Sequence, residues 1–430
     1  MATNWPSIFR SSSGRVYSLA DQGLQGIANI VAMSALGRHL VPAQFGAVGV
    51  AIGIYYFVFG FHRSLVIIPY ITEHYDSLGA AADRRYHSNW WWYGVCTSLI
   101  LSAILGLLAL TLQFVCAWYP AWRWGITPLA LGALMTPPLV WAEHVRRWLY
   151  KIERPDGAAL AALIYAALLV CGAIVLPRFQ LDALGGALAW VAAGLGASLI
   201  PLAVLRPGAF DSAASLACLA RHRAFASWLA LNNLPYSFFS SATVVVLIGM
   251  INGPLAAAVF TAARTLTNPA VSIMSAVDSI DKPRAARALA QQGEAGLRNS
   301  VHKTRMLLIA VTGAYLALVA VLAPILLDLV YHGKYADISA EMRLIALSIF
   351  LFCLNQPSET LLIVLRASRT LFVTRTLTAA VTIAALALGS RHGTMGMAVA
   401  VVAAQAANLL FLAIAEFIVE RRHRPSAGLA

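Results

Sequence analysis

Runs of mostly apolar residues, each about twenty residues long or longer, alternate along the chain with short polar connections. A helix needs ~20 apolar residues to cross a hydrocarbon core about 30 Å thick. The runs therefore predict twelve membrane-spanning helices, at 16–38, 43–70, 88–115, 124–147, 158–177, 183–205, 226–251, 254–277, 304–330, 341–365, 371–390 and 395–419. These helices consume nearly the whole chain and leave no soluble domain of useful size.

The basic residues test this segmentation independently. Of the 31 Lys and Arg residues, 23 fall in connections on one side of the predicted membrane and six in connections on the other. Cytoplasmic loops of membrane proteins carry the excess of Lys and Arg, so both termini are expected in the cytoplasm. The first residues also lack the apolar stretch and cleavage site of a signal peptide, so we expect the first helix to direct insertion.

The composition narrows the possible partners. Sixty per cent of the residues are hydrophobic and 11% are charged, with a formal net charge of +13. Because the basic residues follow the topology, we expect them to meet anionic membrane lipids, and we expect no nucleic-acid partner. Five cysteines stand singly in or beside apolar runs, as small core residues do, so neither a metal site nor a disulfide set is expected.

The longest connections suggest how the chain is divided. Residues 206–225 fall midway and can form an amphipathic helix on the inner membrane surface. We expect a six-helix lobe at 1–205, this cytoplasmic linker, and a second six-helix lobe at 226–430. Residues 36–51 and 248–263 resemble each other in hydropathy and in their Pro-containing turns, which indicates a parallel repeat. The predicted fold class is an all-α polytopic membrane protein.

No enzyme signature accompanies these helices. The sequence has no Gly-rich phosphate loop and no paired His with Glu at helical spacing, so we expect neither catalysis nor a cofactor or metal. Membrane glycosyltransferases that use lipid donors usually have acidic residues in a sizeable first outer loop, which is only about four residues long here. Antiporter-like proton pumps use lysines at mid-membrane, whereas all four lysines of this chain fall in connections.

Arg264 is the best candidate for function. It lies ten residues past Pro254, near the predicted membrane midplane, and Asn268 belongs to the polar side of the same helix. Placing a charge there costs at least about 2.5–3.5 kcal/mol, so a functional role is the first hypothesis. A guanidinium at this depth is suited to binding a phosphate or pyrophosphate. The alternative is a structural ion pair with an acidic residue elsewhere.

Other polar residues inside the predicted helices extend this hypothesis. Arg63 can bind the same anion on the inward-facing side or reach lipid phosphates. Asp21, Gln25 and Asn29 share one face of the first helix because they are four residues apart, and we expect this face to line the lumen. Asp21 and its counterpart Glu359 can bind a coupling proton or cation, or form ion pairs.

The pattern resembles the polysaccharide transporters, the flippases of O-antigen and exopolysaccharide units within the multidrug/oligosaccharidyl-lipid/polysaccharide exporter (MOP) superfamily. The matching segments are the polar first helix SLADQGLQGIANIVAMSALGRHLVPAQFGAVGVA, FTAARTLTNPA, the basic stretch after Asp281, and NQPSETLLIVLRASRTLFVTR. The resemblance implies two six-helix lobes meeting in a V around a central cavity, in the bacterial cytoplasmic (inner) membrane. Flippases of lipid II are similar but typically have two further helices.

Three functions follow as hypotheses. The leading one is a flippase that moves a polyprenyl-pyrophosphate-linked glycan outward by alternating access, driven by a proton or Na⁺ and possibly alongside a polysaccharide polymerase. The second is a cation-coupled multidrug exporter of the same superfamily, which the acidic Asp21 in the first helix keeps open. The third is a membrane scaffold of a polysaccharide synthase. A lumen of positive charge would favour the first over the second.

Overall fold

The structure is a computed structural model that describes residues 13–73, 79–179 and 181–423. The described residues are helical almost throughout, contain no β-strand, and form two compact units. Unit 1 comprises Met1–Leu40 and Ile54–Leu231, and unit 2 comprises Val41–Gly53 and Asn232–Ala430. The predicted lobe boundaries differ slightly from these ranges and remain a prediction.

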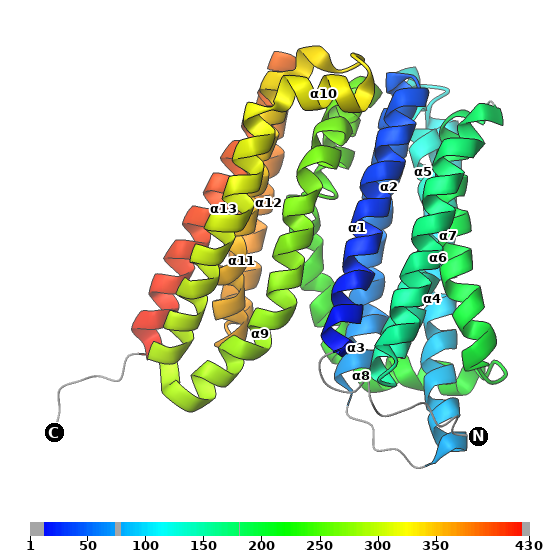
Figure 1. Cartoon of the computed structure of the whole chain (residues 1–430), viewed down its shortest axis with the longest axis vertical. Coiled ribbons are helices and arrows are strands. Elements are labelled where there is room, and N and C mark those ends of the chain that lie inside the picture. The colour runs from blue at the N-terminus through cyan, green and yellow to red at the C-terminus, as the bar shows by residue number, and fades with distance from the viewer. Residues whose placement is uncertain (1–12, 74–78, 180, 424–430) are drawn as a thin grey trace. The chain divides into compact units, whose positions relative to one another are not determined.

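Unit 1 is built from long helices packed side by side (Figure 1). Its helices are α1 (Ser13–His39), the end of α2 (Pro42–His62), α3 (Ile68–Thr72), α4 (Ala80–Val115), α5 (Ile126–Lys151), α6 (Pro155–Val175), α7 (Asp182–Leu205) and most of α8 (Ser212–Ser237). Helix α6 packs against α1 and α7, while α5 packs against α4 and α7. A π-helical turn at Arg63–Ile67 joins α2 to α3.

Unit 2 repeats this arrangement with a second set of helices (Figure 1). They are α9 (Val244–Val321), α10 (Ala323–Tyr331), α11 (Ser339–Val364), α12 (Ser368–Gly389) and α13 (Gly393–His423). Within α9, Gly253 (φ 81°) and Gly293 (φ 66°) have non-helical backbone angles, which glycine adopts without a steric penalty. These two turns divide α9 into three helical stretches.

The order of packing supports the internal repeat. In unit 1, α5 contacts α4 and α7, and α6 contacts α7. In unit 2, α11 contacts α9 and α13, and α12 contacts α13. In this order of packing α5 corresponds to α11, α6 to α12 and α7 to α13. Short 3₁₀ turns at Pro120–Gly125, Leu176–Phe179, Ala336–Ile338 and Ser390–His392 complete the described secondary structure.

The helices have the length and composition of membrane spans. Eight stretches of the described residues are long and apolar enough to cross a membrane, and the last of them, Ser368–Val419, contains both α12 and α13. The predicted span at 226–251 is not among them, and neither are those at 16–38 and 341–365. These last two spans contain polar residues, whose hydrogen-bond and ion-pair partners lie within unit 1 and unit 2, respectively, as described below. The predicted fold class, an all-α polytopic membrane protein with two six-helix lobes, is confirmed.

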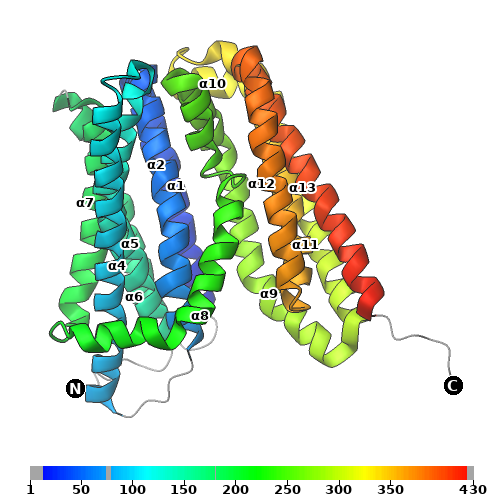
Figure 2. The same ribbon diagram turned by 180° about the vertical axis from the view of Figure 1, so that it is seen from behind.

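Helix α8 runs crosswise to the other helices of unit 1 at one end of that unit (Figure 2). Its approach is fixed by the residues that precede it. Trp92 Nε1 donates to the Gly208 carbonyl (2.9 Å), and the Gly208 amide donates to Ser88 Oγ (2.7 Å). Arg84 Nε donates to the Arg206 carbonyl (2.7 Å). The predicted linker at 206–225 is thus helical from Ser212 and is bound to unit 1.

The predicted continuous span at 226–251 is wrong in its middle. Helix α8 ends at Ser237 and α9 begins at Val244, so six residues interrupt the span. Pro235 cannot donate a helical hydrogen bond, and hydroxyl groups then compete for the backbone. Ser240 Oγ lies 2.8 Å from Thr243 Oγ1, and the Thr243 hydroxyl donates to the Ser237 carbonyl. The break follows from this local chemistry.

The predicted connection at 278–303 is also different in the structure. It is helical on both sides of the turn at Gly293, because α9 continues through it. Its sequence is rich in Ala, Arg and Gln, which are strong helix formers. The sequence analysis treated this segment as a connection because it is polar, although its helix propensity is high.

Close packing of α2 on α9 in unit 2 generates a stability prediction. A Cβ atom added at Gly49 would lie 1.9 Å from Thr261 Oγ1, whereas nothing lies within 4 Å of a Cβ added at Gly106 in α4. Gly49→Ala should lower the free energy of unfolding by about 1–3 kcal/mol through overpacking. Gly106→Ala should raise it by about 0.5–1 kcal/mol. Thermal unfolding of both variants in one detergent checks this prediction. Equal shifts in their melting temperatures would contradict it.

Candidate functional site

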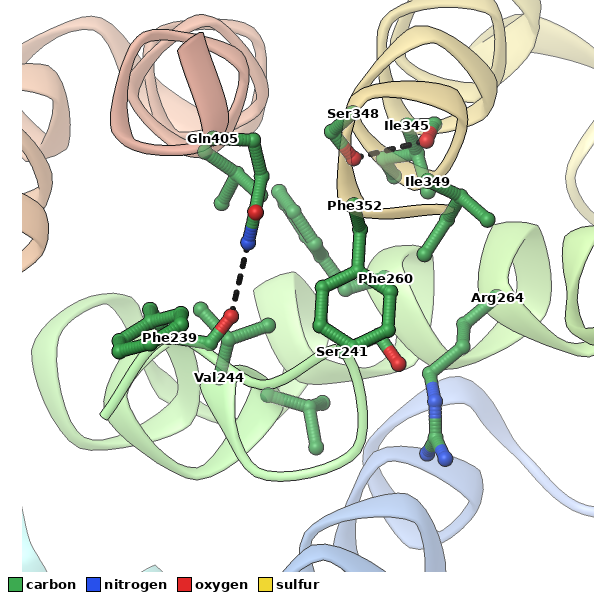
Figure 3. A pocket seen from close by; sticks show the side chains of 12 residues that line it. Phe239, Ser241, Val244, Phe260, Arg264, Ile345, Ser348, Ile349, Phe352 and Gln405 are labelled. Atoms are coloured by element: carbon green, nitrogen blue, oxygen red, sulfur yellow. Dashed lines mark hydrogen bonds between the residues drawn. The ribbon is translucent and has the colours of Figure 1, made fainter. Parts of the chain in front are cut away.

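Arg264 lines a pocket inside unit 2 (Figure 3). The pocket lies where the break between α8 and α9 meets α9, α11 and α13. Its lining residues are Phe239, Ser241, Val244, Val245, Phe260, Arg264, Ile345, Ser348, Ile349, Phe352, Val401 and Gln405. Arg264 itself is partly exposed. The interrupted span thus supplies one wall of the pocket that holds the predicted key residue.

The lining of this pocket contains one charged side chain, a guanidinium. Among its described lining residues, Arg264 is the only one with a charged side chain, and none is acidic. Asn268 lies one helical turn further along α9 and is partly buried. The neighbouring hydroxyls of Thr265 and Thr267 donate to carbonyls of their own helix, at 2.8 Å to Thr261 and 3.2 Å to Ala263. Arg264 is therefore the charged group that this pocket presents.

A chain of amide groups holds the helix break at the pocket wall. Gln405 Nε2 on α13 donates to the Phe239 carbonyl (2.8 Å), as Figure 3 shows. Asn355 Nδ2 on α11 donates to Gln405 Oε1 (3.2 Å). A carbonyl that has lost its helical partner is costly to bury unless another donor reaches it. Gln405 supplies that donor from a distant part of the chain.

Asp21 is buried in unit 1 among several donors. Arg146 Nη1 lies 3.3 Å from its Oδ1, Tyr150 Oη donates to its Oδ2 (2.7 Å), and Gln25 Nε2 donates to its Oδ1 (3.1 Å). Arg146 also pairs with Glu143 at 2.5 Å. Of the two alternatives for Asp21, the structure shows an ion pair. Its role in binding a coupling ion remains a prediction.

The other two residues on this face of α1 also have partners within unit 1. Asn29 Nδ2 donates to the Gln25 carbonyl (2.8 Å). Asn29 Oδ1 accepts from Tyr165 Oη and Trp190 Nε1, both at 3.2 Å. The polar face therefore joins α1 to α6 and α7. Contact of Gln25 or Asn29 with a substrate stays a prediction.

Glu359 has an arrangement in unit 2 that matches that of Asp21. Arg375 Nη2 lies 2.6 Å from Glu359 Oε2, and the Arg375 guanidinium lies 4.9 Å above the Tyr236 ring. Nearby on α11, Gln356 Nε2 donates to Asp278 Oδ1 (2.5 Å). Each unit thus contains a buried carboxylate paired with an arginine of another helix. A coupling-ion role for Glu359 stays a prediction.

Arg63 interacts electrostatically with Glu143, the carboxylate that also pairs with Arg146. Its side chain is exposed, and it begins the π-helical turn that joins α2 to α3. Because Arg63 belongs to unit 1 and Arg264 to unit 2, the structure describes each in its own unit. A shared role of the two arginines stays a prediction.

The sequence analysis missed a polar centre at the end of α3. Glu73 Oε1 accepts from Arg221 Nη1 (2.8 Å) and Glu73 Oε2 accepts from Tyr86 Oη (2.8 Å) and Trp90 Nε1 (3.0 Å). Lys151 Nζ donates to the Glu73 carbonyl (3.1 Å). These bonds join α3, α4, α5 and α8. A lone carboxylate directly after a predicted span, facing a basic linker, was the signal available in the sequence.

Solved structures resemble the whole chain. An inward-facing multidrug-resistance MATE family transporter of the MOP superfamily superposes with a TM-score of 0.67 at 15% identity, covering 94% of this chain and 96% of its own. An outward-facing transporter of that family has a TM-score of 0.61 at 13% identity, covering 96% and 95%. The chain has the fold of the MOP-superfamily transporters. No protein-family model and no curated protein matches the sequence.

A third structure with the MOP-superfamily fold differs in its pocket. It is a MOP superfamily transporter from Pyrococcus furiosus, for which reverse polarity of the binding pocket suggests a different function. It has a TM-score of 0.58 at 14% identity, and the match covers 96% of this chain and 95% of that one. At these identities the likeness concerns the fold, so the pocket of the present chain is interpreted from its own residues.

The buried pair in unit 2 leads to a second prediction. The side chains of Glu359 and Arg375 are 10% and 16% exposed, whereas those of the surface pair Glu294 and Arg298 are 31% and 37% exposed. Glu359→Ala should lower the free energy of unfolding by about 3–5 kcal/mol because it leaves a buried guanidinium without its carboxylate. Glu294→Ala should cost about 0–1 kcal/mol. Denaturant unfolding checks both, and similar losses would contradict the assignment.

Glu73 leads to a prediction about pH. Burial raises the pKa of its carboxyl, but hydrogen bonds from Arg221, Tyr86, Trp90 and His222 outweigh burial and hold the pKa below its ordinary value of 4.5. Its contribution to stability is therefore complete above about pH 4.5 and is lost as the pH falls through the lower, folded-state pKa. Glu73→Gln should cost about 1.5–3 kcal/mol at pH 7.

The check is thermal unfolding of the wild type and Glu73→Gln from pH 8 down to pH 3. The difference between their melting temperatures should stay constant above about pH 5 and shrink below pH 4.5. Glu153→Gln, at an exposed position, serves as the matched control. A difference that grows towards acid pH would show that the sign of the Glu73 shift is wrong.

Proposed function

We propose that the chain is a MOP-superfamily flippase that moves a polyprenyl-pyrophosphate-linked oligosaccharide to the outer leaflet of the bacterial cytoplasmic membrane. The observation that carries the proposal is the unit 2 pocket, in which Arg264 is the charged lining residue and no acidic residue lines the wall. A guanidinium at a pocket wall attracts phosphate and offers it paired donors. A pocket of this charge suits an anionic substrate and repels the cations that many drug exporters carry.

The fold supports translocation by alternating access. The fold neighbours include transporters in inward-facing and in outward-facing conformations. A substrate that is exposed first to one side and then to the other needs no bond to be broken, so the proposed activity is transport. In this proposal O-antigen or exopolysaccharide synthesis uses the translocated unit, and a polysaccharide polymerase acts on it afterwards.

Net transport in one direction requires a driving force. Asp21 and Glu359 are the buried carboxylates that the proposal assigns to a coupling proton or Na⁺, because each can exchange its arginine partner for that cation. Arg63, Asn268, Gln25 and Asn29 complete the proposed substrate contacts. The orientation with both termini in the cytoplasm rests on the distribution of Lys and Arg.

A multidrug exporter is the second candidate. Three phenylalanine rings in the pocket wall, Phe239, Phe260 and Phe352, suit the aromatic groups of many drugs. The fold neighbours described as multidrug transporters point the same way. The positive pocket restricts this candidate to neutral or anionic compounds. Export of a neutral or anionic aromatic compound, abolished by Asp21→Asn, would favour it over the flippase.

The flippase predicts a specific effect of Arg264. In vesicles that contain the purified protein and a lipid-linked oligosaccharide, Arg264→Ala should slow translocation about 10- to 100-fold, because a charged hydrogen bond contributes about 1.5–3 kcal/mol. Arg264→Lys should recover part of the rate, since it keeps the charge and loses the planar fork. Arg343→Ala, at an exposed position in unit 2, is the control. Full translocation by Arg264→Ala would rule out the pyrophosphate grip.

A further inference from the structure

Three histidine side chains are buried near one another in unit 1, and the proposed transport does not use them. His62 ends α2, His87 lies in the first part of α4, and His144 lies in α5. They are 0%, 9% and 1% exposed. His144 is close enough to the other two to interact with both electrostatically. These three residues are called the histidine cluster below. Histidine is the side chain that most readily changes its charge near neutral pH.

Aromatic rings and the backbone of α4 enclose the histidine cluster. The Tyr70 ring stacks on His144 with 5.4 Å between centroids, and Trp91 meets His144 edge-on at 5.6 Å. A Cβ atom at Gly94 would lie 2.9 Å from His144 Nδ1, so the glycine leaves room for the imidazole against α4. Tyr70 Oη lies 2.8 Å from His87 Nδ1. Tyr70 therefore connects two of the three histidines.

Two of the imidazoles have ring nitrogens without a hydrogen-bond partner. His62 Nε2 lies 3.2 Å from the Gly94 carbonyl, which can only accept, so Nε2 carries the hydrogen and Nδ1 of the neutral ring is a bare acceptor. Among the described residues, neither His62 Nδ1 nor either ring nitrogen of His144 has a partner. A buried polar atom in this state is costly. The lone pairs of these rings are therefore available to a proton.

The backbone is irregular at the point where the histidine cluster begins. The π-helical turn Arg63–Ile67 starts directly after His62. Single π-helical turns within α-helices occur frequently at functional sites. Val66, which belongs to this turn, packs in one apolar group with Trp91 and Trp148. The turn thus places His62 against an apolar shell rather than in a regular helix.

Glu143 is the carboxylate that faces the unpartnered imidazoles. It interacts electrostatically with both His62 and His144. It also pairs with Arg146 at 2.5 Å, and Arg146 Nη1 lies 3.3 Å from Asp21 Oδ1. A positive charge on either histidine therefore acts on the same carboxylate that holds the arginine of Asp21.

Other charges around the cluster come from the neighbouring elements. They are Asp83 and Lys151, which interact with His87, Glu73, which interacts with Lys151, and Arg63 and Arg147, which interact with Glu143. Two further helices pack on α5. Helix α7 has no charged residue between its ends, and at the start of α6 Asp156 pairs with Arg154 at 3.2 Å. The cations near Glu143 outnumber it, so a proton can be held on the cluster only where the ion pairs of Glu143 rearrange.

We infer that the histidine cluster is a binding site for one proton, which is held on His62 or His144 and neutralised by Glu143. Charging an enclosed imidazole is costly, and Glu143 offsets that cost by giving up part of its interaction with Arg146. The bound proton thereby acts on the pair of Arg146 with Asp21. The imidazoles repel a second proton because they interact with each other. This inference rests on the proposed proton coupling at Asp21 and names where the proton binds.

Proton binding has a consequence for the packing of unit 1. The neutral imidazoles fit the enclosed arrangement of α3, α4 and α5, whereas a charged imidazole favours contact with water. A proton therefore stabilises any conformation of unit 1 in which water reaches the cluster. Acidification should shift the protein towards that conformation, with or without a substrate.

The test counts protons by potentiometric titration of the purified full-length protein in detergent, without substrate. Between about pH 8 and pH 5, the double variant His62→Gln/His144→Gln should bind about one proton fewer than the wild type. Each single variant should lose little, because the remaining imidazole takes the proton. The matched control is His39→Gln/His392→Gln, at two exposed positions, which should lose about two protons.

Two results would overturn the inference. A double variant that loses no proton would show that the buried histidines stay neutral, and one that loses about two would show that they titrate independently. Where the double variant fails to fold, near-ultraviolet circular dichroism of the wild type decides. The signal of the packed tryptophans should change between about pH 8 and pH 5. A constant signal would contradict proton binding at the cluster.

The outcomes separate this inference from the proposed function. A count of none or two removes the proton site, while translocation that depends on Arg264 would still stand. A count of one, together with no translocation of a lipid-linked oligosaccharide by the wild type, would remove the proposed substrate and leave the proton site in place.

Discussion

The absence of water inside a membrane is the constraint on which this structure depends. Hydrocarbon offers no hydrogen-bond partner, so each polar group within a spanning helix must find one in the protein. The carboxylates of Asp21 and Glu359 are each met by an arginine from another helix. Asn29 bridges to rings on two neighbouring helices. The polar residues of α1 and α11 therefore determine which helices pack together, while the apolar residues between them fill the remaining surface.

Arg264 lines a pocket in unit 2 and is the one charged residue among the lining residues that the structure describes, so its charge acts on whatever enters the pocket. The helix break beside it exists because Pro235 and the following hydroxyl residues cannot continue a regular helix. Irregular backbone inside a membrane is tolerated where it is enclosed by protein or lines a cavity. The break satisfies that condition, because Phe239 and Ser241 belong to the pocket wall.

The sequence was sufficient to predict the fold, but it did not predict which buried side chains pair with one another. Span length and the distribution of Lys and Arg are local properties, so the helices and their division into two sets could be predicted. The pairing of Asp21 with Arg146 joins residues 125 positions apart, and no local pattern specifies it. The break at 238–243 had a visible cause in Pro235 and its hydroxyl neighbours, but hydropathy averages over six residues and hides it. Glu73 was missed because it lies just outside a span.

The bond from Gln405 to the Phe239 carbonyl has a consequence for how such proteins diverge. A regular helix bonds its backbone whatever its side chains are, so its shape survives most substitutions. Here a backbone carbonyl depends on one amide from another helix, and that amide depends on Asn355. A substitution of Gln405 or Asn355 would displace the wall of the pocket, although neither side chain carries a charge that could bind a ligand. Related chains can thus acquire new ligands through residues that act mainly on the backbone of the pocket wall, while the surrounding helices keep a common architecture.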